Sequence, residues 1–407
     1  MRVGDGALQA RGAAARTARR VQPRSRVLAA SGPGARSRRA IPARAVADPA
    51  RDRQPGDRAV NATIGTPVLE GRDLVKHFSV KQGRGLFARR SAVHAVDNVS
   101  VRLDGGKVTA LVGESGAGKT TVGRLLAKII KPDGGSILVD GRPAPAARPR
   151  SYASTVQMVF QDPFASLNPV HRIQHQLARP LQIHHLAGDD VNSAVAGLLA
   201  RVALKPPAQF AAKFPHELSG GQRQRVAIAR ALAVRPRVLI ADEPVSMLDV
   251  SIRLGVLNLL ADLRDKERLA ILYVTHDIAS ARYLADTISV MYAGQLVESA
   301  PSVELTDQPA HPYTQLLLSA APDPDRAQQP VLAGHGAPPS LLAPPSGCRF
   351  HPRCPYAMDV CKREAPPSVT VGAGHIAACW LHVDPAGRQA SENGVPAAEL
   401  EKETQKR

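Results

Sequence analysis

A glycine-rich run that ends in lysine and threonine, at residues 113–121, contains the residue types in this chain best suited to bind a polyphosphate. Its members are Gly113, Glu114, Ser115, Gly116, Ala117, Gly118, Lys119, Thr120 and Thr121. Glycines let backbone N–H groups close around phosphate oxygens, and a helix that starts there adds a favourable dipole. Lys119 can then reach the β- and γ-phosphates, while the Thr120 hydroxyl can coordinate Mg²⁺. The spacing predicts a site for ATP with Mg²⁺.

Two adjacent acids follow a second apolar run, at residues 238–241. Asp242 would lie at the end of a buried strand, where its carboxylate can hold Mg²⁺ directly or through water. Glu243 is then placed to orient or polarise the attacking water, which is a general-base role. An apolar strand that ends in two acids is common, so this prediction depends on the glycine-rich run upstream.

A second candidate anion site lies at residues 218–222. Its members after Leu218 are Ser219, Gly220, Gly221 and Gln222. Ser219 suits a helix N-cap, and the glycines leave backbone N–H groups exposed at the positive end of a helix. Two phosphate-binding helix starts in one domain cannot easily serve the same nucleotide. The sequence therefore favours a head-to-tail dimer in which each such segment closes over the partner's ATP.

Short apolar runs alternate with amphipathic stretches from residue 68 onward, a pattern typical of a three-layer α/β domain. The expected buried strands are residues 108–112, 238–241 and 269–274. The expected helices are residues 120–130, with apolar Val122, Leu125, Leu126 and Ile129, and residues 250–266, while residues 171–213 should be mainly helical. Asp140 and Gly141 predict a tight turn.

Composition and charge argue against a nucleic-acid partner. Aromatic residues make up only 3% of the chain, too few for base-stacking platforms. The net charge is +18, but residues 1–60 carry 14 Arg and no Lys against 4 Asp, a net of +10, which leaves +8 for the remainder. No apolar run approaches the roughly 18 residues that span a bilayer, and the N-terminus lacks the apolar core of a secretory signal. We expect a soluble, cytosolic product that meets a membrane only through partners.

The chain is expected to have unstructured ends. Residues 1–66 are rich in Arg, Ala, Pro and Gly and predict disorder. An organelle transit peptide, a tail that touches anionic surfaces, or translation from a misplaced start would give the same pattern. Residues 322–345 are dense in Pro, Ala and Gly and are typical of a linker, and residues 385–407 form a polar tail.

These motifs, in this order, resemble the ATP-binding-cassette (ABC) transporter ATPases over residues 68–382. The resemblance implies roles for four more residues. Phe78 aligns with the aromatic residue that stacks on adenine, and Gln161 with the glutamine that contacts Mg²⁺ and water and reports to the membrane subunits. Asp249 aligns with a loop that crosses the dimer interface, and His276 with the histidine that contacts the γ-phosphate. Since no motif is degenerate, the resemblance implies ATP hydrolysis.

The same resemblance implies the fold class. It is α/β, a P-loop NTPase of the ABC type with an antiparallel β subdomain, an inserted α-helical subdomain and a C-terminal extension that contains the cysteines. The expected limits are residues 67–320 for the ATPase domain, with the helical lobe at about 162–235, and residues 321–384 for the C-terminal module.

Three segments resemble the oligopeptide/dipeptide importers within that family: residues 161–169, 311–314 and 345–355. Residues 121–126 and 246–260 resemble the F-type ATPase subunit more than the D-type. This branch implies a D-type ATPase or a second copy as partner, two integral-membrane permeases and a peptide-binding protein, at the cytoplasmic face of the membrane. A nickel, glutathione or other small-solute importer shares many of these motifs. A non-transport ABC ATPase would usually carry two cassettes or a long inserted coiled coil.

Four cysteines lie close together near the C-terminus and need an explanation of their own. They are Cys348, Cys354, Cys361 and Cys379. The spacing lacks the Cys-x2-Cys pair of most structural zinc sites, and a Pro-rich segment with little core favours a metal or cluster that holds it together. The resemblance implies a [4Fe–4S] cluster on all four thiolates. Zinc, with His351 or His375 as a substitute ligand, and four unligated thiols are the alternatives.

Overall fold

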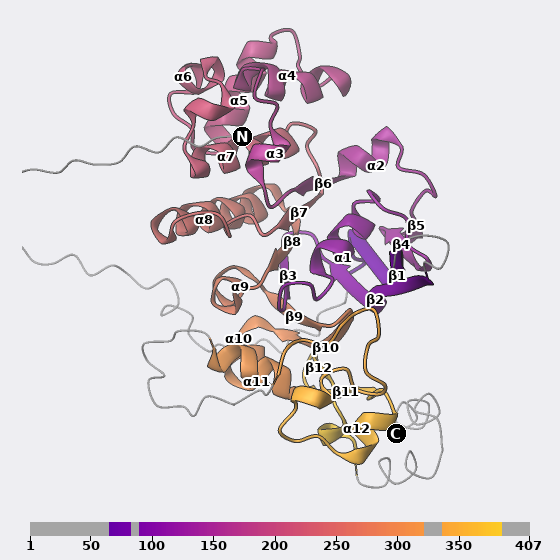
Figure 1. Ribbon diagram of the computed structural model, residues 1–407. Helices are drawn as coiled ribbons and strands as arrows, with labels where there is room; N and C mark the ends of the chain where they lie inside the picture. Colours follow the sequence, from indigo (N-terminus) through magenta and orange to yellow (C-terminus); the bar gives the residue numbers. More distant parts are fainter. Residues whose placement is uncertain (1–64, 83–88, 321–335, 385–407) are drawn as a thin grey trace, which may run out of the picture. The chain divides into compact units, whose positions relative to one another are not determined.

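The computed structural model of the chain describes residues 65–82, 89–320 and 336–384 (Figure 1). The expected N-terminal tail lies outside the described residues except for its last two positions. The expected polar tail at 385–407 lies wholly outside them, and the expected linker is described only from residue 336 onward.

Five short apolar runs form a parallel sheet in the order β9-β3-β8-β7-β6. These strands are β3 (Val108–Val112), β6 (Val156–Val159), β7 (Val238–Asp242), β8 (Ala270–Thr275) and β9 (Thr287–Tyr292). Every residue of β3, β7 and β8 is buried, because helices or strands cover both faces of the sheet. The strands predicted at 108–112, 238–241 and 269–274 are confirmed to within one residue.

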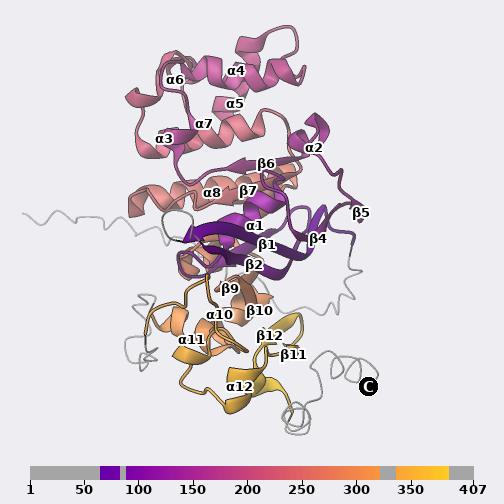
Figure 2. The same cartoon turned by 45° about the vertical axis from the view of Figure 1, so that its right-hand side comes forward.

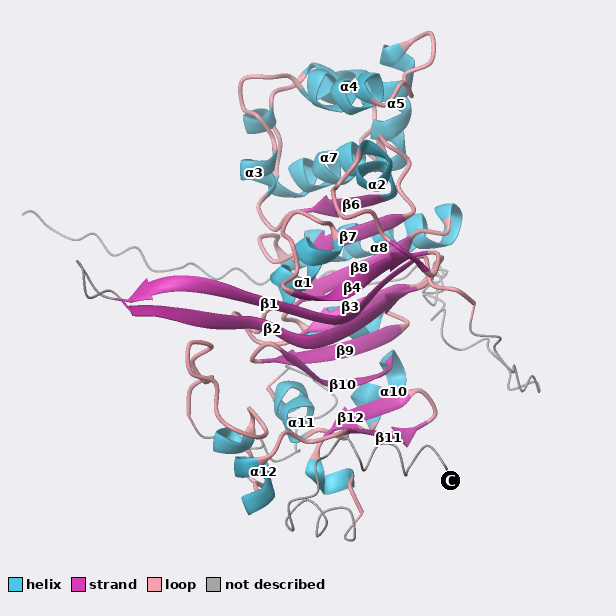
Figure 3. Ribbon diagram, turned by 90° about the vertical axis from the view of Figure 1, so that its right-hand side faces the viewer, coloured by secondary structure: helices cyan, strands magenta, loops and turns pink. Residues whose placement is uncertain are grey.

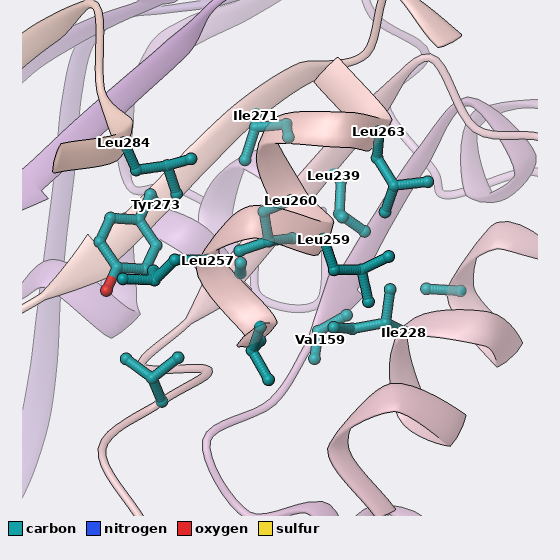
Figure 4. Close-up of a cluster of buried hydrophobic side chains, with 14 of the residues drawn as sticks. Val159, Ile228, Leu239, Leu257, Leu259, Leu260, Leu263, Ile271, Tyr273 and Leu284 are labelled. Carbon is teal, nitrogen blue, oxygen red and sulfur yellow. The ribbon is translucent and has the colours of Figure 1, made fainter. Parts of the chain in front are cut away.

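One face of this sheet is covered by helices from the second half of the chain. They are α8 (Val250–Glu267), α9 (Ile278–Leu284) and α10 (Ser302–Asp307). Figure 4 shows Leu257, Leu260 and Leu263 of α8 in one buried cluster with Leu239 and Ile271 of the sheet. Full burial of a leucine contributes roughly 1.5–3 kcal/mol. This layer therefore fixes the strand ends from which the functional loops leave.

The other face carries helix α1 and a separate antiparallel sheet in the order β2-β1-β4-β5 (Figure 3). Its strands are β1 (Leu69–Gln82), β2 (Arg89–Leu103), β4 (Gly134–Val139) and β5 (Arg142–Pro143). The predicted turn joins β4 to β5, where Asp140 and Gly141 have φ of 49° and 74°. Two successive positive φ values are the requirement of a type I′ hairpin turn.

Helix α1 (Lys119–Leu126) is shorter than predicted. The sequence pattern extends it to residue 130, but Lys128 takes a left-handed φ of 53° and the N–H of Ile129 bonds back to the carbonyl of Arg124 at 2.9 Å. A left-handed residue just past the last turn ends a helix. Ile129 lies outside the helix and is 44% exposed, so the predicted extension of the helix to residue 130 is wrong.

The region predicted to be mainly helical, residues 171–213, forms a helical lobe together with the segments on either side of it. The lobe contains α3 (Pro163–Ser166), α4 (Ile173–Ile183), α5 (Val191–Arg201), α6 (Pro207–Ala212) and α7 (Gly220–Leu232). Figure 2 shows it beyond β6, the edge strand of the parallel sheet. A further short helix, α2 (Arg150–Thr155), precedes β6.

The C-terminal residues extend the central sheet. Strand β10 (Gln295–Pro301) pairs antiparallel with β9, β12 (His375–Ala378) pairs with β10, and β11 (Ser368–Gly372) forms the new edge. Helices α11 (Pro312–Ser319) and α12 (Asp359–Arg363) lie in the segment between β10 and β11. The expected extension is therefore part of an eight-stranded sheet. Among the helices described, none has the length and apolar character to cross a membrane.

Candidate functional site

The glycine-rich run leaves β3 and enters α1, as predicted, and it is packed too tightly for side chains at two of its glycines. A Cβ at Gly113 would lie 2.1 Å from the carbonyl oxygen of Met291, and a Cβ at Gly118 would lie 2.1 Å from that of Ala95. Because a backbone oxygen cannot move aside without breaking the sheet, only glycine fits at either place. We call residues 113–120 the phosphate loop below.

Lys119 is buried at the start of α1. Its Nζ donates hydrogen bonds to the carbonyl oxygens of Gly113 at 2.7 Å and Glu114 at 2.8 Å, so the loop curls around the ammonium group. Burial lowers the pKa of Lys119, and the charges of Glu243 and Asp242 oppose that shift. The lysine is thus a desolvated cation beside the loop's N–H groups, which is the environment that a phosphate anion favours.

Thr120 and Asp242 form the pair suited to Mg²⁺. The Thr120 hydroxyl donates to Oδ1 of Asp242 at 2.9 Å, which joins the first turn of α1 to the end of β7. Asp242 is buried, and burial raises its pKa, with the Thr120 hydrogen bond opposing the shift. A hydroxyl and a carboxylate are hard oxygen ligands, so these two atoms fit a magnesium ion.

Glu243 follows Asp242 and is held from two sides. Gln161 donates from Nε2 to Oε2 of Glu243 at 2.9 Å, and Nδ1 of His276 lies 3.3 Å from Oε1. The backbone of Glu243 has a φ of 45°, and its N–H donates to the carbonyl of Val274 at 2.9 Å. A left-handed φ at a non-glycine residue is costly, and such strain concentrates at functional sites.

These residues surround a cavity of about 670 Å³. Its lining contains Glu114, Ser115, Gly116, Gly118, Lys119, Thr120, Thr121, Gln161, Glu243 and His276, together with Ala95 and Leu317. The structure thus brings the phosphate loop, Glu243 and two residues implied by resemblance to one place. Ala95 and Leu317 were not predicted, since neither carries a polar group that a sequence pattern could mark.

Two family models match parts of the chain: residues 96–246 match the ABC transporter model, and residues 297–361 match the oligopeptide/dipeptide transporter C-terminal region. The oligopeptide transport ATP-binding protein AppF of Bacillus subtilis is 42% identical over 77% of this chain and 97% of its own length. This chain belongs to the oligopeptide/dipeptide branch of the ABC transporter ATPases. The di/tripeptide transport ATP-binding protein DppF of Pseudomonas aeruginosa is 45% identical over 74% of this chain and 93% of its own length.

A solved structure supports the fold class. The chain is similar to cbiO1 from Clostridium perfringens, which is part of the ABC transporter complex cbiONQ. The TM-score is 0.51 at 26% identity, over 60% of this chain and 92% of that one. The predicted α/β cassette is therefore confirmed. The family match and the ATP-binding relatives confirm the predicted ATPase and its use of ATP.

The second candidate anion site, residues 218–222, forms a capped helix start, as predicted. The Ser219 hydroxyl accepts from the N–H of Gln222 at 3.3 Å, and the Gln222 side chain accepts from the N–H of Ser219 at 3.0 Å. None of the residues 218–222 lines the cavity around the phosphate loop. Asp249 is exposed at the start of α8 and does not line that cavity either.

Phe78 lies on β1 and is 38% exposed. The ammonium group of Lys76 lies 5.5 Å from the centre of its ring. The ring does not line the 670 Å³ cavity, so the structure leaves the adenine contact as a prediction.

The structure gathers the four cysteines of the ABC ATPase in one region. The N–H of Cys348 donates to the carbonyl of Cys361 at 2.8 Å. Burial, together with smaller effects of the charges of the other three cysteines, raises the pKa of Cys379 to about 12. Burial likewise raises the pKa of Cys348 to about 11. No three of these sulfur atoms lie within 4.8 Å of one another.

Both histidines named as substitute zinc ligands have other partners. His375 is buried, with Nε2 2.7 Å from Glu298 and Nδ1 3.2 Å from Glu304. Both of its ring nitrogens are therefore used, which argues against His375 as a ligand. Nδ1 of His351 lies 2.9 Å from the carbonyl of Cys348.

Proposed function

We propose that this chain is the ATP-hydrolysing, nucleotide-binding subunit of an ABC importer that powers the uptake of dipeptides and oligopeptides through partner permeases. The observation that carries the ATPase assignment is the Glu243 carboxylate, held between Gln161 and His276 at the edge of the phosphate-loop cavity. An intact base in contact with both partners argues against a subunit that binds ATP only as a structural element.

In this proposal Lys119 and the loop N–H groups bind the β- and γ-phosphates. Thr120 and Asp242, together with Gln161, would hold Mg²⁺. The ion would neutralise the charge of the phosphoryl group. Glu243 orients the attacking water and accepts its proton. His276 contacts the γ-phosphate and keeps the Glu243 carboxylate in place.

The site is completed by a partner ATPase in a head-to-tail dimer. The capped start of α7 presents the N–H groups of Gly220, Gly221 and Gln222 at a positive helix end. This segment does not line the chain's own cavity. It would therefore close over the ATP bound by the partner, with Ser219 and Asp249 at the interface. The partner is a D-type subunit or a second copy.

The peptide cargo is inferred from relatives whose names are those of peptide transporters. Two permeases and a peptide-binding protein complete the assembly, and the chain works at the cytoplasmic face of the membrane. Residues 67–320 then form the ATPase domain, with its helical lobe at about 162–235, and residues 321–384 form the C-terminal module.

Affinity purification of the tagged chain from its own membranes tests the assembly. Two integral-membrane proteins and a second ATPase should copurify, and cells that lack the chain should lose uptake of a labelled dipeptide. Restored uptake with the wild-type chain but not with Glu243→Gln supports peptide import. Normal dipeptide uptake in the deletion strain, with loss of nickel or glutathione uptake, would instead assign another cargo.

We also propose that the four cysteines hold a [4Fe–4S] cluster. A single Zn²⁺ with thiolates at about 2.3 Å would hold the sulfurs about 3.8 Å apart. No three of the four sulfurs lie that close together, which disfavours a single Zn²⁺ and leaves the larger [4Fe–4S] cluster as our proposal. Burial raises the pKa values of Cys348 and Cys379, and ligation to a cation would favour their thiolate forms. The cluster would cross-link a segment that otherwise has a small apolar core of Val360, Cys361 and Trp380.

Elemental analysis of anaerobically purified protein tests this site. About four iron and four sulfide per chain, with a broad visible absorption, is the expected result. Cys379→Ser should lose both, whereas wild-type protein with one zinc and no iron would overturn the cluster in favour of zinc.

A further inference from the structure

The phosphate loop carries an acid where an anion must bind. Glu114 lines the 670 Å³ cavity, beside the N–H groups and the lysine that would receive the phosphates. An unpaired carboxylate there would repel a nucleotide, because like charges a few ångströms apart interact strongly when partly desolvated. The loop therefore needs a positively charged protein group that neutralises Glu114 without occupying the nucleotide site.

Arg353, from the cysteine-bearing segment, is that cation. Its Nη1 donates to both carboxylate oxygens of Glu114 at 3.0 Å, across 239 positions of sequence. The two side chains are 11% and 26% exposed, so solvent screens the pair only in part. Arg353 directly precedes Cys354, which ties the pair to the proposed cluster site.

A second contact fixes the backbone at the same residue. The N–H of Glu114 donates to the hydroxyl oxygen of Tyr313 at 2.9 Å. Tyr313 is fully buried on α11, and the centre of its ring lies 4.5 Å from that of Tyr292 and 5.4 Å from that of Phe350. The guanidinium of Arg353 lies 5.8 Å from the Tyr292 ring and 5.9 Å from the Phe350 ring. One aromatic cluster thus carries both contacts to Glu114.

The arginine is oriented for this pair at the expense of another donor. Its Nε is buried and has no hydrogen-bond partner in the part of the chain that the structure describes. Buried donors normally have a hydrogen-bond partner. Because Nε of Arg353 lacks one, the position of this side chain is explained by its ion pair with Glu114.

We propose that Arg353 of the C-terminal module and Tyr313 of α11 position the phosphate loop of this ATPase. Arg353 neutralises Glu114 and Tyr313 fixes its backbone, so that nucleotide affinity depends on both contacts. The inference rests on the nucleotide site proposed above and goes beyond it. It assigns a positioning role to Arg353 and Tyr313, which lie outside the motifs that line the cavity. Leu317 of α11 also lines the cavity, so the helix that carries Tyr313 supplies part of its wall.

Binding of ADP with a fluorescent ribose group, in the presence of Mg²⁺, tests this on the full-length chain without turnover. Lys119→Ala must first abolish binding; if it does not, the nucleotide site is assigned wrongly and the positioning role is overturned with it. Arg353→Met should then raise the nucleotide Kd by roughly tenfold at low salt. The matched control is Arg363→Met, an exposed arginine of the same module, which should leave Kd unchanged.

The double variant separates neutralisation from a merely structural role. Glu114→Gln should bind at least as tightly as wild type, and Glu114→Gln with Arg353→Met should return to within about threefold of it. The defect of Arg353→Met should also shrink as salt rises. A double variant as weak as Arg353→Met, or an unchanged Kd in Arg353→Met, would overturn the proposal.

Tyr313→Phe keeps the test decisive if Arg353→Met does not fold. It retains the ring and removes only the oxygen that receives the Glu114 N–H. Kd should rise by about threefold, on the scale of one hydrogen bond, in protein that still unfolds in one cooperative transition. A wild-type Kd in a well-folded Tyr313→Phe contradicts the positioning role.

Discussion

Gln161 donates a 2.9 Å hydrogen bond to the carboxylate of Glu243. The residue that the family resemblance connects to the membrane subunits is therefore in direct contact with the proposed catalytic base. Any displacement of the segment at residues 161–169 would move the base, which gives permease docking a route to ATP turnover.

Gln161→Ala should lower the turnover rate much more than it weakens nucleotide binding. The variant removes one of the two contacts that orient Glu243, and a misplacement of about 1 Å can cost up to about 100-fold in rate. Stimulation of ATPase activity by the permeases should be lost as well. The matched control is Gln174→Ala, an exposed glutamine of α4 that bonds only to Asn192 among the described residues. Equal stimulation of Gln161→Ala and wild type would exclude this coupling.

Asp242→Asn should stabilise the nucleotide-free protein while abolishing its Mg²⁺ response. Burial raises the pKa of Asp242 above its ordinary value of 3.8. Between 3.8 and that raised pKa the folded state holds a proton that the unfolded state has lost, so stability rises as pH falls through this window. At neutral pH that contribution is absent in wild type, whereas asparagine avoids the cost of a buried charge.

The effect of the Asp242 charge on stability is measured by the melting temperatures of wild type and Asp242→Asn between pH 7 and pH 4.5. Asp242→Asn should melt higher at pH 7, with the gap narrowing as pH falls. Mg²⁺ should tighten ATP binding in wild type only. A variant that melts lower than wild type at pH 7 would show that Asp242 stabilises the fold as an ion.

Ser219→Arg should block hydrolysis without weakening nucleotide binding to the chain's own phosphate loop. Ser219 caps α7 away from the cavity, and an arginine there would obstruct the approach of a partner's ATP. Ser193→Arg, at an exposed position near the start of α5, is the control for added charge in the same lobe. Loss of nucleotide binding by the isolated Ser219→Arg chain would contradict a site completed in trans.

The sequence was enough to predict structural features that depend on interactions between residues close together in the chain. The strand at residues 108–112, the turn at Asp140 and Gly141 and the cap at Ser219 each depend on neighbours within a few positions. The end of α1 was missed because the left-handed conformation of Lys128 has no glycine to mark it.

Long-range contacts were not predictable in the same way. Strand β12 joins the central sheet through Glu298 and Ser299 of β10, a pairing that no periodicity specifies. The contact between Arg353 and Glu114 joins the cysteine-bearing segment to the phosphate loop. The sequence marked the first as a possible metal site and the second as a nucleotide site, and no motif connected the two. Charge complementarity between an acid in a phosphate-binding loop and an arginine elsewhere was the only available signal, and the chain contains many arginines.

Glu243→Gln tests the central claim most directly, in the complex assembled with its permeases and partner ATPase. The amide keeps the size of the side chain but cannot accept the proton of the attacking water, so we expect ATP turnover at the site that contains Glu243 to fall by about 100-fold or more. Binding of ATP should stay within about threefold of wild type, since no phosphate contact is removed. A single-turnover measurement with labelled ATP at that site separates the two quantities. Hydrolysis at the wild-type rate would contradict the assignment of Glu243 as the base.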